Sequence, residues 1–297
     1  MRAAMIVNPA KSDVAEIRTR IDETFSAAGW SESLWLETTP EDPGRAMAEA
    51  AVAAGVQLVG ICGGDGTVMA CLSALADSTL PVAIIPVGSG NLLARNLGIP
   101  LEVDDALASA LHGEDRRIDL GRLGDGQPFA VMAGMGFDAA MMADTTERMK
   151  RFAGWPAYVA SGLRHLRDPA MRVELSIDGG PPLRRYARTV LVANVGELEG
   201  GLELLPDAAA DDGMLDVVVV APRTLRDWIR VAYRIARHRK HDRHLERFEG
   251  RTISIQADRD VPRQADGEVI AKGRRIDARV EPGALVLRVP QSTSAAA

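Results

Sequence analysis

The sequence predicts an α/β domain with a doubly wound, mostly parallel sheet, followed by a mostly antiparallel β domain that carries helices. Up to residue 120, short apolar runs alternate with segments of helical period, and the connections between them are short. Alternating strands and helices of this kind build a parallel sheet that is covered on both faces. After Ile118, strand-like runs separated by turns dominate, which is typical of an antiparallel sandwich or barrel.

The first 120 residues contain apolar runs that predict strands and periodic segments that predict helices. Gly29 and Gly55 follow two of the helical segments, where glycine commonly ends a helix in the left-handed conformation. In chain order we predict strands at 3–7, 34–37, 58–62 and 82–85, and helices at 14–28, 44–54, 67–76, 92–97 and 104–111.

The second part reads mainly as strands, with helical patterns only at 139–167 and 225–239. The turns Asp178-Gly179-Gly180 and Glu281-Pro282-Gly283 separate several strand-like runs. We therefore predict a nucleotide-binding domain at 1–120 and a second domain at 121–283, with the final segment 284–291 returning to the first domain because termini often lie close together. The predicted strands are 129–133, 172–177, 189–194, 215–220, 252–256, 276–280 and 285–289.

The composition of the chain excludes few functions but indicates a globular protein with a large core. The chain has 297 residues, 46% of them hydrophobic, so it can bury a large core, and its net charge of −6 gives no indication of nucleic-acid binding. No apolar run reaches the roughly 18 residues of a membrane span, and the apolar N-terminus is too short for a signal peptide. Cys62 and Cys71 lie in apolar surroundings and are interpreted as small core residues of a cytoplasmic protein.

The strongest motif is Gly63-Gly64-Asp65-Gly66-Thr67, which follows an apolar strand and precedes a helix. Glycines there permit positive φ and close approach to a ligand, and the N–H groups of the turn and helix start would bind phosphate. A carboxylate beside phosphates suggests a magnesium ion between them and Asp65. The alternative is a plain glycine-rich connection.

Two further turns are predicted at the same edge of the sheet, where ligands bind in doubly wound folds. Pro86-Val87-Gly88-Ser89-Gly90-Asn91 follows the next strand and offers polar side chains at Ser89 and Asn91. The alternative is a simple turn with Ser89 as a helix cap. Asn8-Pro9-Ala10-Lys11-Ser12 is either an ATP contact or a strand end with Ser12 or Asp13 as the cap, and Lys11 has no assigned role.

These turns occur in the order and spacing of the diacylglycerol kinase catalytic domain, which the chain resembles over nearly its whole length. Downstream segments resemble the same family, and the chain is similar to its soluble bacterial lipid kinases. The matching segments are Gly134-Met135-Gly136-Phe137-Asp138, Asn194 with Gly200-Gly201, Leu205-Pro206-Asp207-Ala208, Asp211-Asp212-Gly213-Met214-Leu215-Asp216 and Gln264-Ala265-Asp266-Gly267-Glu268.

The resemblance implies an NAD-kinase-like α/β domain, a β-sandwich, and transfer of phosphate from ATP to a lipid hydroxyl with Mg²⁺. Glu268 would accept the proton, with Asp65 as the second catalytic residue. Asp212, with the main-chain oxygens of Ala209 and Met214, would hold a magnesium ion. The implied ATP-binding residues are Asn8, Thr39 (or Thr38), Gly63, Gly64, Asp65, Gly66, Thr67, Val68, Met69, Gly88, Ser89 and Asn91.

Two departures bear on the acceptor. The commonest second turn of the family is G-T-x-N-D, whereas this chain has Ser89 and Leu92 at the second and last of these positions. The G-S-G-N form is closer to sphingosine and ceramide kinases. Two other functions are considered. One is NAD kinase, which shares the G-G-D-G-T turn, and the other is a nucleotide-binding regulator without catalysis. The chain keeps both Asp65 and Glu268, which disfavours the regulator.

Residues 223–243 combine eight Lys or Arg residues with Trp228, Ile229, Tyr233 and Ile235. Such a basic, partly apolar helix suits peripheral contact with an anionic membrane, or its apolar face packs on the β domain. His238, His241 and His244 share one helical face and are interpreted as part of a solvated basic surface. An oligomer is compatible with the sequence.

Overall fold

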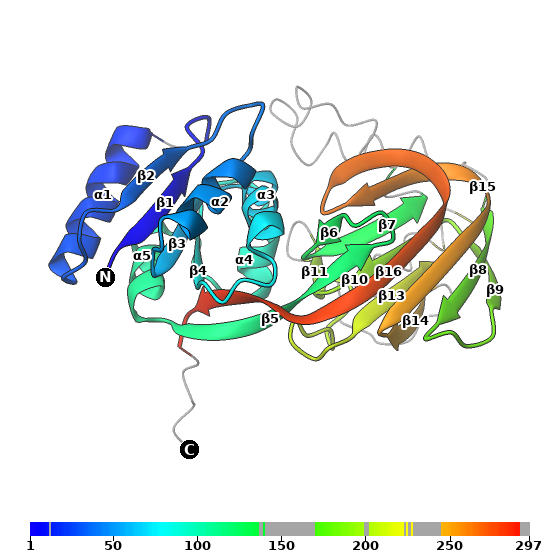
Figure 1. Cartoon of the computed structure of the whole chain (residues 1–297). Coiled ribbons are helices and arrows are strands. Elements are labelled where there is room, and N and C mark those ends of the chain that lie inside the picture. Colours follow the sequence, from blue (N-terminus) through cyan, green and yellow to red (C-terminus); the bar gives the residue numbers. More distant parts are fainter. Residues whose placement is uncertain are drawn as a thin grey trace, which may run out of the picture. The chain divides into compact units, whose positions relative to one another are not determined.

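The computed structural model describes residues 1–11, 13–136, 139, 170–198, 202–222, 224, 227 and 245–291 (Figure 1). The helices predicted at 139–167 and 225–239 lie outside these residues apart from single positions, as do Phe137 and Asp138. The chain divides into two compact units, Met1–Leu120 with Pro282–Ala297, and Gly121–Glu281. We refer to them as unit 1 and unit 2 and describe each by itself.

Unit 1 contains a parallel sheet of the predicted kind. Its strands are β1 (Ala3–Val7), β2 (Leu34–Glu37), β3 (Leu58–Gly63) and β4 (Val82–Pro86), in the order β4-β3-β1-β2, and all three pairs are parallel. The last part of β16 (Glu268–Val289) adds a further parallel neighbour to β4, with Leu287 opposite Val82. The α/β fold class predicted for this part of the chain is confirmed.

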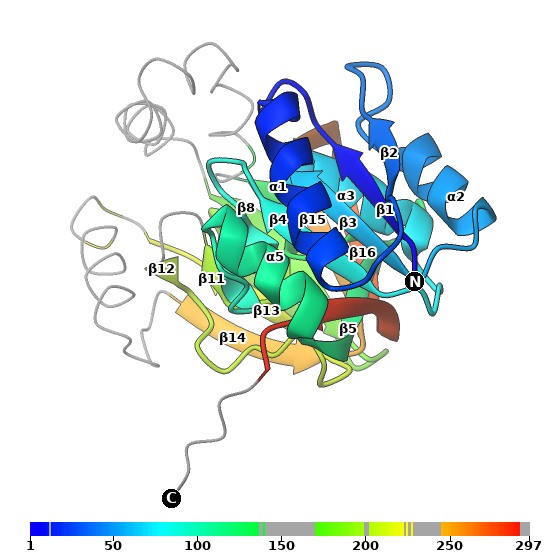
Figure 2. The same ribbon diagram turned by 90° about the vertical axis from the view of Figure 1, so that its left-hand side faces the viewer.

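Helices cover both faces of this sheet because alternate strand residues point to opposite sides. Figure 2 shows α1 and α5 on one side of the strands and α2 on the other. Met5 and Ile85 pack with Phe25 and Leu107 in one core, while α2 packs on α3. The helices are α1 (Val14–Ala27), α2 (Arg45–Ala53), α3 (Asp65–Leu75), α4 (Leu92–Asn96) and α5 (Val103–His112).

Unit 2 is a mostly antiparallel β structure, as predicted. β15 links its two layers: Ile253–Ala257 pairs with β8, and Arg263–Ala265 pairs with β7, with register shifts between. The remaining order is β14-β13-β10-β7. β5 (Glu114–Leu123) begins in unit 1 and ends in unit 2. The other bounds are β6 (Pro128–Phe129), β7 (Met132–Gly136), β8 (Met171–Ile177), β9 (Leu183–Ala187), β10 (Thr189–Ala193), β11 (Glu197–Leu198), β12 (Leu202–Glu203), β13 (Leu215–Val220), β14 (Leu245–Gly250) and β15 (Thr252–Ala265).

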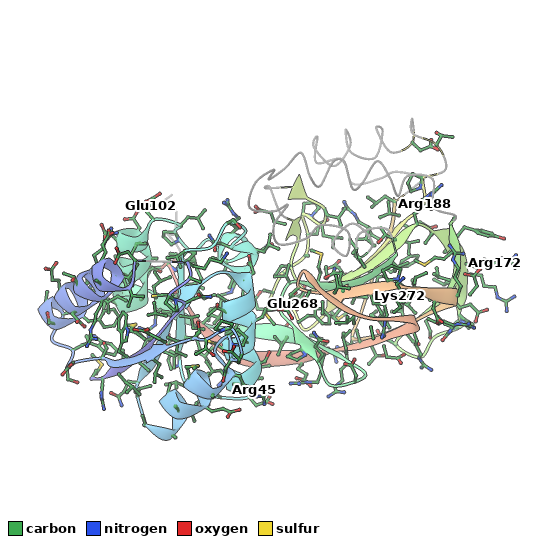
Figure 3. All side chains as sticks on the ribbon, turned by 90° about the horizontal axis from the view of Figure 1, so that it is seen from above. Arg45, Glu102, Arg172, Arg188, Glu268 and Lys272 are labelled. Atoms are coloured by element: carbon green, nitrogen blue, oxygen red, sulfur yellow. The ribbon has the colours of Figure 1, made fainter. Side chains whose placement is uncertain are left out.

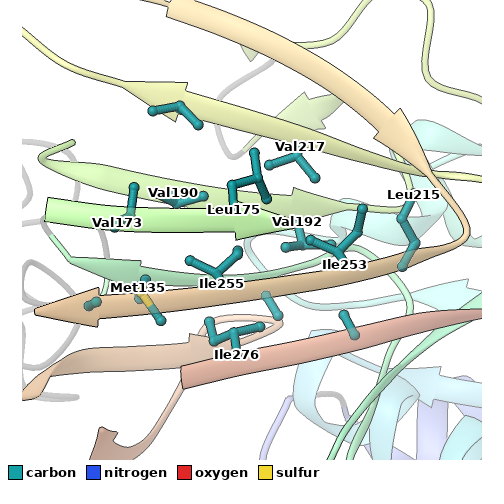
Figure 4. Packing of buried hydrophobic residues seen from close by; sticks show 14 of the residues in the cluster. Met135, Val173, Leu175, Val190, Val192, Leu215, Val217, Ile253, Ile255 and Ile276 are labelled. Atoms are coloured by element: carbon teal, nitrogen blue, oxygen red, sulfur yellow. The ribbon is translucent and has the colours of Figure 1, made fainter. Parts of the chain in front are cut away.

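Buried apolar side chains of these strands build the core of unit 2. Figure 4 shows side chains of β8, β10, β13 and β15 projecting toward one another. Val190, Val192, Val217 and Ile255 are among the fully buried members. Burying each such side chain stabilises the fold by about 1.5–3 kcal/mol before chain entropy is counted. The apolar residues that predict these strands therefore also form the core, alternating with exposed residues in β8 but buried throughout in β10.

Several strand predictions for the second part are wrong in extent. The turn expected at 281–283 is absent because β16 runs through it: the Gly283 N–H donates to Asp119 Oδ1 at 2.8 Å, and Arg117 donates to the Gly283 carbonyl. The strand expected at 129–133 is β7, Met132–Gly136, whose glycines weaken the local signal. Strands β5, β9 and β14 are missing from the prediction, because adjacent charged residues interrupt their apolar pattern.

Candidate nucleotide site and catalytic residues

The three turns expected to bind ATP lie together at one edge of the unit 1 sheet. β1, β3 and β4 are parallel neighbours, with Val7 opposite Cys62 and Gly63 opposite Pro86, so their carboxyl ends are level. The Asn8 N–H donates to the Cys62 carbonyl at 2.9 Å, and the Val87 N–H donates to the Gly63 carbonyl at 3.2 Å. The predicted shared edge is thus present in the structure.

Asp65 ties the first glycine turn to the second. Its Oδ2 accepts a hydrogen bond from the Asn91 N–H at 2.9 Å, and its Oδ1 accepts one from the Leu92 N–H at 2.6 Å. Asp65 thereby caps α4 from outside the helix. Ser89, the alternative cap, is exposed, and the residue that directly precedes α4 is Asn91. Both oxygens of Asp65, the residue predicted to lie beside a magnesium ion, thus accept main-chain amides.

Glycines in these turns serve close packing rather than positive φ, so that part of the prediction is wrong. A Cβ on Gly88 would lie 2.6 Å from the Gly64 Cα, and one on Gly90 would lie 2.6 Å from Asp65 Oδ2. Distances under 3 Å force the backbone apart. The left-handed residue of the second turn is Asn91, with φ of 52°. The two turns therefore touch through their backbones.

Side-chain amides complete the connection among the turns. Asn8 Nδ2 donates to Thr67 Oγ1 at 2.8 Å, which joins the first turn of the chain to the buried start of α3. Asn91 bonds Gly88 twice, accepting from its N–H at 3.0 Å and donating to its carbonyl at 2.8 Å. Hydrogen bonds of this kind fix the loop before any ligand arrives, which is what a phosphate site requires.

The start of α3 supplies the groups that can meet an anion. The helix begins at Asp65, two residues earlier than predicted, so the N–H groups of its first turn have no acceptor within the helix. Gly66 is exposed beside them. Val68, one of the predicted ATP-binding residues, has a side chain that is 5% exposed, and its N–H donates to the Gly64 carbonyl. The side chain of Val68 thus packs inward from the first turn of α3.

Asp13 and Thr39 also have defined local roles. Asp13 caps α1 by accepting from the Ala15 and Glu16 N–H groups, as the alternative reading of the first turn proposed. Thr39 is exposed after β2, and its Oγ1 accepts from the Asp42 N–H at 3.1 Å. Thr38, the other candidate, is buried and donates its N–H to the Val7 carbonyl. Thr39 is thus the one whose side chain reaches the surface.

Glu268 is the first residue of β16, directly after a two-residue turn that follows β15 (Figure 3). Its side chain is exposed, and within the described part of the chain no residue forms a hydrogen bond or ion pair with its carboxylate. Ala265 lies opposite it in the ladder. An exposed, unengaged carboxylate can accept a proton from a substrate hydroxyl.

The predicted magnesium ligands lie in an acidic part of unit 2. Asp212 is exposed, and its Oδ1 accepts from the Met214 N–H at 2.9 Å. Burial, followed by the charges of Glu249 and Asp212, raises the pKa of Asp216 to about 6. Excess negative charge with main-chain carbonyls nearby suits a hard cation, so these residues fit magnesium. In the described residues no three His, Cys, Asp or Glu side chains form a ready-made metal cluster.

The two cysteines are buried, as predicted, and burial raises the pKa of each thiol to about 12. The basic segment 223–243 lies outside the described residues apart from Thr224 and Asp227, as do His238, His241 and His244. Of the helices in the described ranges, none is long and apolar enough to cross a membrane.

Comparison with known proteins identifies both halves of the chain. Residues 2–123 match the diacylglycerol kinase catalytic domain, and residues 130–289 match the YegS C-terminal NAD kinase beta sandwich-like domain. A "Probable lipid kinase YegS-like" from Pseudomonas fluorescens is 32% identical over 98% of this chain and 96% of that protein. A "Diacylglycerol kinase" from Bacillus subtilis is 30% identical over 90% and 89%.

Solved structures agree on the fold. A diacylglycerol kinase from Bacillus anthracis superposes with a TM-score of 0.75 at 23% identity, covering 97% of this chain and 96% of that one. An NAD kinase from Archaeoglobus fulgidus, in complex with ATP, superposes with a TM-score of 0.55 at 15% identity, covering 97% and 93%. The resemblance read from the sequence is confirmed: the chain belongs to the family of lipid kinases that join a diacylglycerol kinase catalytic domain to a YegS-type β-sandwich.

Proposed function

We propose that this protein is an ATP-dependent kinase that transfers the γ-phosphoryl group to a hydroxyl of a diacylglycerol-like lipid. The observation that carries the proposal is the joined set of turns at the carboxyl edge of β1, β3 and β4, with the start of α3 among them. It presents main-chain N–H groups where the triphosphate of ATP would lie. The names of the relatives support a lipid as the acceptor.

In the proposed reaction, the lipid hydroxyl oxygen forms a bond to the γ-phosphorus while the bond from that phosphorus to the β,γ-bridging oxygen breaks. The hydroxyl proton goes to the Glu268 carboxylate, and ADP leaves. Phosphoryl transfer depends mainly on positioning and charge neutralisation. The α3 amides and the Asn8–Thr67 and Asp65–Asn91 bonds would hold the phosphates still. Thr39, Gly88 and Ser89 are proposed as further nucleotide contacts.

Magnesium is proposed as the cofactor, and it would neutralise phosphate charge when bound. Asp212, with the carbonyls of Ala209 and Met214, would hold one ion that orders its loop. If so, adding Mg²⁺ at pH 8 should raise the Tm of the wild type and should not raise that of Asp212→Asn. An equal rise in both proteins would exclude Asp212 as a ligand. Asp207→Asn, which changes the same charge nearby, is the matched control.

A panel assay decides the acceptor. The full chain is incubated with γ-labelled ATP and Mg²⁺ and, separately, diacylglycerol, monoacylglycerol, sphingosine, ceramide, phosphatidylglycerol or NAD. We expect label in diacylglycerol. Label in sphingosine or ceramide would follow the G-S-G-N form of the second turn and correct the acceptor but not the reaction. Label in NAD alone, the activity named for the structural relative from Archaeoglobus fulgidus, would overturn the proposal.

We also propose that the enzyme works in the cytoplasm and contacts the membrane surface through residues 223–243. Eight basic side chains in that segment support attraction to anionic lipid. Replacing Arg230, Arg234 and Arg237 by Gln should weaken sedimentation with phosphatidylglycerol vesicles and leave neutral vesicles unaffected. Unchanged sedimentation would remove this part of the proposal.

A further inference from the structure

The turn that precedes Glu268 has a fixed and unusual backbone. It consists of Asp266 and Gly267, with φ of 45° and 84°, between the end of β15 and the start of β16. Two consecutive residues with positive φ match the right-handed twist of the flanking strands. Glycine adopts this conformation freely, whereas aspartate does so at some cost and is enriched there only because its short side chain bonds locally.

The Asp266 carboxylate holds three consecutive main-chain amides. Its Oδ2 accepts from the Ala130 N–H at 2.7 Å, and its Oδ1 accepts from the Val131 and Met132 N–H groups at 2.9 and 2.8 Å. The Asp266 N–H donates back to the Met132 carbonyl at 2.8 Å. Charge-assisted hydrogen bonds of this kind are about twice as strong as neutral ones. The turn is therefore clamped to a segment more than 130 residues away in sequence.

Both sides of this clamp are supported by buried amide side chains. Gln264 is fully buried, and its Oε1 accepts from the Gly267 N–H at 3.0 Å. Asn194 is 1% exposed; its Nδ2 donates to the Ala130 carbonyl at 3.1 Å, and its N–H donates to the Val131 carbonyl at 2.9 Å. Segment 130–132 is thus held on one side by Asn194, the residue that directly follows β10, and on the other by Asp266.

Glu268 has no such support of its own. Among the residues that the structure describes, none bonds its carboxylate, so the position of that group depends on the backbone of the turn. A base displaced by about 1 Å loses about 100-fold in rate. We infer that Asp266 is a positioning residue, which sets the place of the Glu268 carboxylate by clamping the turn to residues 130–132. This inference rests on the proposed role of Glu268 as proton acceptor.

The chain offers a matched control in Asp178. It has φ of 51° in another turn of unit 2, and its Oδ1 accepts from the Arg251 and Thr252 N–H groups, each at 2.8 Å. Like Asp266, Asp178 has a positive φ and a carboxylate that accepts main-chain amides, but no proposed catalytic residue follows it. A merely structural role for Asp266 predicts that both aspartates respond alike to substitution.

The test uses the full chain, γ-labelled ATP and the panel lipid that the wild type phosphorylates fastest. Asp266→Asn keeps Oδ1 and tolerates positive φ, but turns an NH₂ group against the Ala130 N–H. We expect kcat to fall about 10-fold. Asp266→Gly keeps the backbone freedom and loses every acceptor, and we expect a fall of about 100-fold. The KM for ATP should stay within about twofold in both, and Asp178→Asn should keep wild-type kcat.

A double variant adds the readout that a structural role would not move. If Asp266 acts through Glu268, Asp266→Asn should cost almost nothing further in the background of Glu268→Gln. An additive loss, or a kcat loss in Asp178→Asn equal to that in Asp266→Asn, would overturn the inference. If Asp266→Asn keeps the wild-type kcat while Glu268→Gln is inactive, the positioning role of Asp266 is overturned and the proton-acceptor role of Glu268 stands.

Other outcomes separate the inference from the function on which it rests. An active Glu268→Gln would overturn the proton-acceptor role and the positioning role together, as would a wild type that labels no lipid. Hydrogen exchange needs no variant: in the wild type the amides of 130–132 should exchange slowly. Rapid exchange there would show that the clamp does not hold, even if both Asp266 variants failed to fold.

Discussion

Two Asp-Gly pairs of this molecule, Asp65-Gly66 at the start of α3 in unit 1 and Asp266-Gly267 in a turn of unit 2, use their aspartates alike. They depend on glycine differently. Each carboxylate accepts main-chain amides from a segment distant in sequence: Asn91 and Leu92 for Asp65, and residues 130–132 for Asp266. In unit 1 the neighbouring glycines are required because two backbones touch, whereas Gly267 has open space around its Cβ position and is required for its positive φ.

This difference explains why one motif is easy to recognise and the other is not. Gly64 and Gly88 touch through their backbones, and Gly63 and Gly90 lie against the side chains of Thr67 and Asp65. A Cβ at any of these positions would be crowded, so the glycines form a dense pattern in the sequence. A hairpin turn with positive φ is common in any antiparallel sheet and says nothing about chemistry. The role proposed for the Asp266-Gly267 turn depends on its contacts with residues 130–132, which form only when the chain folds.

The largest effect should come from Glu268→Gln. The substitution keeps size and hydrogen bonding but removes the proton acceptor, so kcat should fall by about 100-fold to 10,000-fold. Binding of ATP, measured by calorimetry, should not change, because the groups proposed for ATP belong to unit 1. Activity within twofold of the wild type would contradict the catalytic role of Glu268, and the Asp266-Gly267 turn would then have only a structural role.

Gly88→Ala should come next, because a Cβ there would lie 2.6 Å from the Gly64 Cα. Forcing the two turns apart should lower the free energy of unfolding by about 1–3 kcal/mol and weaken ATP binding. Ser89→Ala, at the exposed neighbouring position, is the control and should leave stability unchanged. Equal stability of Gly88→Ala and the wild type in urea would mean that the turns are not in contact.

Asp65→Asn should have a smaller effect than either. One carboxylate oxygen stays as an acceptor and the other becomes a donor facing a main-chain N–H, at a cost of about 1–3 kcal/mol. We expect the KM for ATP to rise by about 10-fold while the lipid KM is unchanged, because Asp65 fixes the second turn. A fall in kcat without any change in KM would instead favour a direct catalytic role for Asp65.

The smallest effect is expected for Asp216→Asn. Asp216 lies near other carboxylates, whereas Asp65 and Asp266 accept hydrogen bonds from main-chain amides. Its folded pKa, raised to about 6, lies above the usual value of 3.8, so its ionised form destabilises the fold once the pH passes through this window. Asp216→Asn, without magnesium, should therefore raise the free energy of unfolding by about 1 kcal/mol at pH 8, after allowance for solvent screening, and have little effect at pH 4.

Asp178 should respond to pH in the opposite sense. Hydrogen bonds from main-chain amides, Thr252 first, lower its folded pKa below 3.8. Its contribution is therefore present above pH 4 and lost as the pH falls through the folded pKa. Thermal unfolding of Asp178→Asn should show a lower Tm than the wild type at pH 7 and a smaller difference at pH 3. The same sign of pH dependence for Asp178 and Asp216 would contradict this electrostatic picture.

The sequence alone determined the α/β unit in near-complete detail. Strands β1 to β4 and helices α1 to α5 lie within two residues of their predicted bounds, because periodicity, glycine punctuation and short connections all agree there. It also located the phosphate turn and the resemblance that names the family. In unit 2 it gave the antiparallel class but missed β5, β9 and β14, since charged, half-exposed strands lack an apolar signature.

Only the tertiary structure decided what the aspartates do. Asp65 accepts the amides of Asn91 and Leu92, and Asp266 accepts those of residues 130–132. Neither set of partners is predicted by the sequence. A carboxylate has the same local signature whether it meets a metal, a proton or a main-chain amide. Its partner is chosen by segments far away in sequence, and these meet only when the strands pair.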